Sequence, residues 1–196
     1  MINRMFLLVV ALALMAGQAA AQIDPDPNGL GIYFDLEASQ HSAGVPVFTP
    51  FTMYLILTNA SAAGGVFGWE CTIEYDDTNM LVLDWVPTNW SGSVFDPSNF
   101  AIGLETPLPW EPAINLMTIT AMMLTPDCSW LSIIPYPNPS IPDNIVYVDG
   151  ADPWNLIPMY QSTGGPEFPV AGINCEVPPP VSAEDFNWGG MKTLYR

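Results

Sequence analysis

Short apolar runs, broken every few residues by proline, glycine, asparagine or aspartate, constrain the fold of this 196-residue chain more than any other feature. Several of the runs alternate between apolar and polar residues, which is the period of a β-strand with one face in a core. None repeats with the 3.6-residue period of a capped helix. Many short alternating strands separated by turn residues are typical of an antiparallel β-sandwich or jelly roll. We therefore predict an all-β fold with little helix.

The alternation predicts about nine strands. Two runs, 55–57 and 81–83, are apolar at every position and predict strands buried on both faces. The proline-rich stretch 135–169 predicts irregular loops that contain one or two short edge strands. The predicted strands cover residues 31–38, 50–59, 66–75, 80–85, 99–104, 114–124, 130–134, 145–148 and 169–174.

The first 21 residues have the three parts of a secretory signal peptide. Arg4 supplies the positive start, residues 5–15 are apolar, and Ala19-Ala20-Ala21 forms a small-residue cleavage site. The apolar run is too short to span a bilayer, so we predict no membrane insertion and a secreted product that is extracellular, periplasmic or on the cell surface. The predicted organisation is a signal peptide at 1–21, an acidic N-terminal arm at 22–29, a sandwich domain at 30–176, and a proline-rich spacer with a C-terminal tail at 177–196.

The chain is acidic because it lacks bases. It has 20 aspartates and glutamates against three lysines and arginines, and its formal net charge is −17. Binding to nucleic acids or to anionic lipids requires a positive surface, so we predict neither kind of partner. A hydrophobic content of 49% is too high for a disordered acidic segment. The predicted partners are therefore extracellular proteins or glycans.

Three cysteines in an exported chain predict one disulfide and one remaining thiol. Alternation in the segment 69–75 places Cys71 on the apolar face, where a thiol can persist as a small buried hydrophobe. Cys128 and Cys175 lie near the ends of predicted strands, so we predict a Cys128–Cys175 bridge. A zinc site is the alternative, but the chain has no CxxC pair and a single histidine.

Acidic residues gather at two predicted turns, Asp76-Asp77 and Asp149-Gly-Ala-Asp152. Converging carboxylates can bind Ca²⁺, whereas aspartates are also common in turns for their local hydrogen bonds. We favour solvated turns and keep Ca²⁺ as the alternative; no other cofactor is predicted. The arm begins a similar run, Asp24-Pro-Asp26-Pro-Asn-Gly, which we interpret as an acidic segment because its prolines stiffen the loop.

Three of the seven tryptophans, Trp90, Trp110 and Trp154, lie in predicted loops. Exposed rings there can stack on sugars, so these residues are the candidates for ligand binding. The other interpretation is that the rings pin loops onto the sandwich. His41 is the only histidine, and no catalytic motif occurs, so we predict no catalytic residues and no enzyme.

The segment 51–85 resembles the opening strands of cohesin-like domains. It reads FTMYLILTN, a glycine-rich turn, GWECTIEYD and then MLVL, where those domains have a strand, a G-x-x-x-x-I-x-Y-D strand and a short L-x-L strand. This resemblance implies a jelly-roll β-sandwich with an extracellular role in binding protein or carbohydrate. The whole chain also resembles a group of bacterial secreted proteins with no activity attached, which share GIYFD, YLILTN, GWEC, PLPW and GINC.

The sequence thus predicts a secreted, non-enzymatic β-sandwich that serves as an extracellular binding or surface-structural module. A lectin-like carbohydrate-binding module, stabilised by calcium, is the alternative. Residues 181–196 either dock on the sandwich or are read by another molecule, and their aromatic residues favour docking.

Overall fold

A computed structural model describes residues 24–96, 98–166 and 168–177 of the chain. These residues form twelve strands and no helix, so none of their elements is a helix that could cross a membrane. The predicted all-β sandwich is confirmed, with more strands than the predicted nine or so. The strands are β1 (Gly29–Tyr33), β2 (Ser42–Ala43), β3 (Pro50–Thr58), β4 (Val66–Tyr75), β5 (Met80–Pro87), β6 (Trp90–Asp96), β7 (Asn99–Leu108), β8 (Ala113–Met123), β9 (Ser129–Ile134), β10 (Ile145–Asp149), β11 (Leu156–Gln161) and β12 (Ala171–Ile173).

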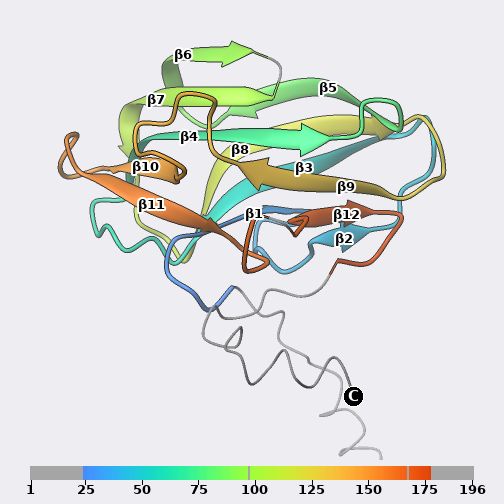
Figure 1. Ribbon diagram of the computed structural model, residues 1–196, viewed down its shortest axis with the longest axis horizontal. Helices are drawn as coiled ribbons and strands as arrows, with labels where there is room; N and C mark the ends of the chain where they lie inside the picture. Colours follow the sequence, from blue (N-terminus) through green and yellow to red (C-terminus); the bar gives the residue numbers. More distant parts are fainter. Residues whose placement is uncertain (1–23, 97, 167, 178–196) are drawn as a thin grey trace, which may run out of the picture.

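The strands form two sheets that pack face to face (Figure 1). Sheet A has the order β1-β3-β8-β5, and every pair in it is antiparallel. Sheet B runs from β6 through β7 to β4, and the far side of β4 pairs with β10 near one end and β9 near the other. β12 and β2 extend sheet B beyond β9.

Two strand pairs depart from the predicted antiparallel arrangement. β11 pairs with β10 and also, through Tyr160 and Gln161, runs parallel to β1, so it links the two sheets. β2 runs parallel to β12. Parallel neighbours require a long connection between them, and alternation along a strand carries no information about such distant pairing.

The core lies between the sheets and contains the face of β4 that the alternation predicts. Trp69, Cys71 and Ile73 are buried, and Tyr75 packs against them. Aromatic rings connect the sheets: Phe100 lies 5.9 Å from Trp69 and 5.1 Å from Trp85, measured between ring centroids. Trp69 therefore belongs to the core, and Trp85 packs against it.

One of the two runs predicted to be buried on both faces is exposed instead. Leu55, Ile56 and Leu57 are fully buried, because Tyr33 and Ala38 pack over Ile56 on the outer side of sheet A. Leu81 and Leu83, in contrast, are 45% and 47% exposed. β5 is the outermost strand of sheet A, and its register shifts between Val82 and Asp84. The prediction for 81–83 is therefore wrong, because nothing among the described residues covers the outer side of β5.

Two strands, β2 and β6, lie where the sequence predicts loops, and a third, β11, lies in the stretch 135–169 without predicted bounds of its own. β2 has only two residues, β6 contains no apolar alternation in its first half, and β11 contains Pro158. Within 135–169 the predicted edge strand at 145–148 is the inner strand β10, which lies between β4 and β11. The neighbouring strand β11 tolerates Pro158, although a proline in the sequence argues against a strand.

The predicted disulfide between Cys128 and Cys175 is confirmed. Its two Cα atoms lie 5.2 Å apart, and it joins the start of β9 to the segment after β12. The remaining cysteine, Cys71, is fully buried.

We expect the Cys71 thiol to be inert in the native protein. Burial raises its pKa far above the ordinary value, and the neighbouring Glu70 adds to the shift, so the reactive thiolate is absent at neutral pH. Ellman's reagent should titrate no thiol in buffer and one thiol in guanidinium without reductant. A Cys71→Ala variant should give none in either condition. A full equivalent of thiol in the native wild type would contradict this burial.

Candidate binding surface

The outer face of sheet B contains a hollow of about 250 Å³ across β7, β4 and β10. Its floor has almost no side chains, because Gly103 pairs with Gly68 across the sheet and Ala101 lies beside them. A Cβ atom on Gly68 would lie 2.8 Å from the carbonyl oxygen of Ile102, so this position requires glycine. We call this site the sheet B hollow; Val146, Val148 and Leu156 form its apolar wall, and Glu70 and Ser140 its polar wall.

Glu70 is a buried carboxylate on an otherwise apolar surface. It lies on the outward face of β4 and is only 8% exposed. Ser140 covers it with two hydrogen bonds: its backbone N–H donates to Oε1 at 2.5 Å, and its hydroxyl donates to Oε2 at 2.9 Å. Ser140 belongs to the connection between β9 and β10, which crosses over β4 and β7 (Figure 1).

No cationic side chain neutralises Glu70 within the described part of the chain. All three basic residues, Arg4, Lys192 and Arg196, lie outside it. A buried carboxylate without a cation is costly even when hydrogen-bonded. The sheet B hollow therefore offers an apolar surface with one negative group that a cation from outside would stabilise.

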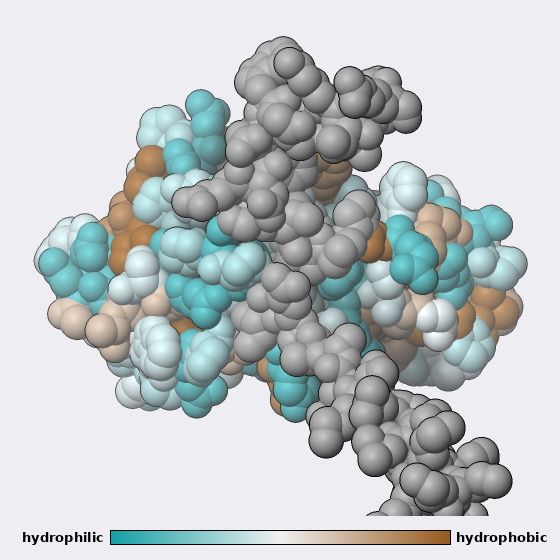
Figure 2. Space-filling view, turned by 90° about the horizontal axis from the view of Figure 1, so that it is seen from below, coloured by the Kyte–Doolittle hydropathy of each residue, from teal (hydrophilic) through white to brown (hydrophobic). Residues whose placement is uncertain are grey.

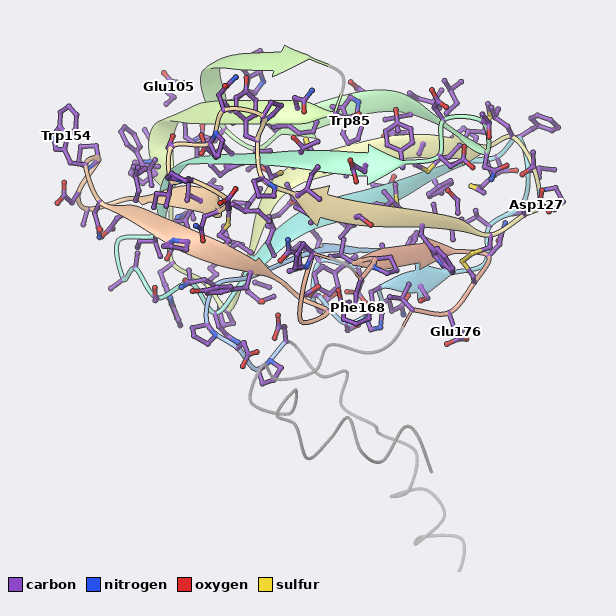
Figure 3. The ribbon with its side chains drawn as sticks, in the orientation of Figure 1. Trp85, Glu105, Asp127, Trp154, Phe168 and Glu176 are labelled. Carbon is purple, nitrogen blue, oxygen red and sulfur yellow. A yellow bond between two sulfur atoms is a disulfide. The ribbon has the colours of Figure 1, made fainter. Side chains whose placement is uncertain are left out.

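The three tryptophans that the sequence selects all lie at one end of the sandwich. Trp110 donates its Nε1–H to the carbonyl of Ala60 in the β3–β4 loop at 2.8 Å, and Gly150 after β10 donates its N–H to Gly65 of the same loop at 3.0 Å. Trp90 is the first residue of β6. The preceding Asn89 donates its side-chain amide to the carbonyl of Thr106 in β7. Trp154 is 91% exposed and points away from the body at the tip of the β10–β11 loop (Figure 3).

These rings do not line the sheet B hollow. Trp90 and Trp110 are 46% and 49% exposed, so about half of each side chain is covered. Sugar stacking by the three residues stays a prediction. The alternation missed another ring: Trp130 of β9 is 56% exposed on the outer side of sheet B.

The two acidic turns lie at opposite ends of the molecule, and their carboxylates hydrogen-bond locally. Asp76, between β4 and β5, accepts from Thr78 and Asn79, and these bonds hold its pKa below the usual value. Asp149 accepts from Ala151 and Asn155, and Asp152 accepts from the Trp154 N–H. Asp77 lies beside Asp76 and is exposed. Within the described ranges no three acidic, histidine or cysteine residues converge as metal ligands. Solvated turns stay the prediction, with Ca²⁺ binding as the alternative.

His41 is half-buried between β1 and β2. Burial lowers its pKa, while Glu176 and Asp35 act in the opposite direction. Its Nδ1 atom has no hydrogen-bond partner among the described residues. No nucleophilic side chain in the described part of the chain is hydrogen-bonded to this ring.

Comparisons with solved structures find cohesin modules. The sixth cohesin of scaffoldin B from Acetivibrio cellulolyticus, solved in complex with a Cel5 dockerin, superposes with a TM-score of 0.52 at 11% identity, covering 77% of this chain and all of that one. A type II cohesin from the same organism's cellulosome gives 0.48 at 14%, covering 78% and 98%. The cohesin module of a Clostridium perfringens family 33 glycoside hydrolase gives 0.44 at 12%, covering 67% and 90%.

The cohesin-like β-sandwich that the sequence resembles is therefore confirmed as the fold. No family model matches the sequence. None of the curated proteins matches it either.

Proposed function

We propose that this chain is an exported, non-catalytic binding module whose sheet B hollow receives a protein partner. The observation that carries the proposal is the Glu70 carboxylate, buried beside an apolar hollow with serine as its only described partner. A glycine floor leaves room for a side chain from another molecule. The similar cohesin from Acetivibrio cellulolyticus is solved bound to a dockerin, a protein.

The charge of the chain indicates what such a partner carries. With a net charge of −17, the chain attracts cationic proteins and repels acidic ones. A lysine or arginine of the partner would enter the sheet B hollow and pair with Glu70, with its aliphatic stem against Val146 and Val148. Arginine fits best, because its planar fork can contact a carboxylate at two points.

Export and the absence of catalysis belong to the same proposal. The signal-peptide pattern of residues 1–21 lies outside the described residues, and the Cys128–Cys175 disulfide supports an oxidising compartment. The lone histidine and the locally bonded aspartates offer no acid–base pair for hydrolysis.

The test compares variants of the sheet B hollow in partner binding. The immobilised chain is used to capture secreted proteins of the producing organism, and the dissociation constant of each captured protein is then measured. Glu70→Gln and Ala101→Trp should each weaken binding at least tenfold, about 1.4 kcal/mol. Glu74→Gln is the matched control, because Glu74 lies four residues further along β4 on the same face and is exposed. A partner that binds all four proteins equally would contradict the proposal.

A glycan-binding function is the second candidate, and the 91% exposure of Trp154 favours it. Tryptophan fluorescence with a panel of polysaccharides tests it on the same proteins. A glycan that quenches the wild type and Glu70→Gln but not Trp154→Ala would place binding on the loop end rather than in the sheet B hollow.

A further inference from the structure

A second cavity, of about 360 Å³, lies between the N-terminal arm and the segment after β11. Its walls are largely apolar and include Pro27, Tyr160 and Pro166, and the carboxyl-bearing residues Asp24 and Asp26 line one side. This cavity, which we call the arm cavity, is separate from the sheet B hollow and shares no lining residue with it.

Local features of β1 and the β3–β4 loop bury the Asp24 carboxyl. Asp24 is 2% exposed, and its Oδ2 atom lies where a Cβ of Gly29 would be, so β1 carries glycine at this point. The arm is fixed in place by Asn59, whose side-chain amide donates to the Asp24 carbonyl at 2.7 Å. The Asp24 carboxyl accepts one hydrogen bond from the described residues, from the Asp26 N–H at 3.0 Å.

Burial without a cation makes the charged form of Asp24 unfavourable. Desolvation raises its pKa to about 6, the Asp26 N–H partly offsets this, and the negative charge of Asp26 adds to the rise. Two hydroxyl-bearing side chains, Tyr33 and Ser162, are buried next to each other nearby. Both lie beside Gly31, which is two residues after Gly29 and on the same face of β1. The described residues thus supply no lysine or arginine to pair with the buried Asp24 carboxyl.

We propose that the arm cavity receives the C-terminal segment of this same chain, residues 181–196, whose basic side chains pair with Asp24 and Asp26. Lys192 and Arg196 are the only lysine and arginine of the predicted mature chain, so the segment carries side chains of complementary charge. Its Trp188, Leu194 and Tyr195 match the apolar walls. This inference does not depend on the proposed function of the sheet B hollow.

Chain connectivity makes this occupant more favourable than a separate molecule. The described chain begins in the arm below β1 and ends after β12 on the same side of the sandwich (Figure 1). Figure 2 shows that side, and Phe168 and Glu176 mark it in Figure 3. The sixteen residues from Val177 to Lys192 can extend about 50 Å. A tethered segment is present at a high effective concentration and avoids most of the entropy cost of association.

Zero-length cross-linking of the full chain tests the docking. Lys192 is the only lysine, so a carbodiimide can join its amine to a carboxylate in contact with it at one unambiguous position. We expect peptides that link Lys192 to Asp24 or Asp26, at least tenfold more abundant than links to Asp76 or Asp77 at a far turn. An Asp24→Asn/Asp26→Asn variant should lose the links, and an Asp76→Asn/Asp77→Asn variant should keep them.

An equal mixture of ¹⁴N- and ¹⁵N-labelled protein separates docking within one chain from docking between copies. Links within one isotope support the proposal. Mixed-isotope links would overturn it in favour of exchange between molecules. Links spread evenly over the carboxylates, or no link to Lys192 while the protein is folded, would also overturn it.

Discussion

Replacing Phe100 with alanine is expected to lower the free energy of unfolding by about 3–5 kcal/mol. Phe100 is fully buried, and its ring contacts Trp69 of the same sheet and Trp85 of the opposite sheet. Removing the ring takes away both contacts and leaves a cavity between the sheets. The strands around it are held by backbone pairing and cannot collapse to fill the space. Guanidinium unfolding followed by tryptophan fluorescence measures the change.

Leu83→Ala is the matched control, because Leu83 is also a large apolar residue in a strand but is 47% exposed. Its substitution should cost less than about 1 kcal/mol, since most of its surface is already in water. Phe100→Leu should fall between the two variants. Equal losses for Phe100→Ala and Leu83→Ala would contradict the position of Phe100 between the sheets.

The inward face of a strand is readily predicted from sequence, and β4 shows why. Its alternation of Trp69, Cys71 and Ile73 with polar residues reflects a local rule, since successive side chains point to opposite faces. The same rule failed at Leu81-Val82-Leu83, where apolar residues fill every position. Whether another element covers β5 depends on the tertiary fold, which a run of three residues does not encode.

The residues of the two candidate sites were harder to predict because their burial is not local. Glu70 alternates onto the outward face of β4, where a glutamate normally contacts water. Ser140, seventy residues later, covers it from a connection that the sequence indicates only as a proline-rich loop. The sequence around Asp24 likewise predicts a solvated arm. In the structure, Asn59 after β3 and Gly29 of β1 contact Asp24 and enclose it.

One sequence signal did point to these sites. The chain has no lysine or arginine between Arg4 and Lys192, so the described residues offer no such side chain to compensate a buried carboxylate. The shortage of lysine and arginine disfavours nucleic-acid partners. It also means that a cation paired with Glu70 or Asp24 comes from a partner or from the C-terminal tail. The tail itself, with the signal peptide, lies outside the described residues, and their predicted roles stay predictions.

Removing the Cys128–Cys175 disulfide should destabilise the protein by about 4 kcal/mol. The bridge closes a loop of 47 residues, and the loss of loop-closure entropy in the unfolded chain accounts for a stabilisation of that size. The expected change appears in a Cys128→Ala/Cys175→Ala variant as a lower guanidinium midpoint. Cys71→Ala serves as the control, because it removes a buried thiol without removing a cross-link.

Because of the disulfide, the stability of the fold depends on whether the compartment is oxidising. It ties the start of β9 to the segment that follows β12, and Val177 in that segment packs against Gly172 of β12 and donates its N–H to Ser42 of β2. Dithiothreitol should therefore lower the stability of the wild type by the same amount as the double substitution and leave the double variant unchanged. A wild type that is equally stable with and without reductant would show that β9, β12 and β2 hold together through strand pairing alone. The loss expected instead means that the chain reaches full stability only where the bridge can form, which agrees with a protein made for export.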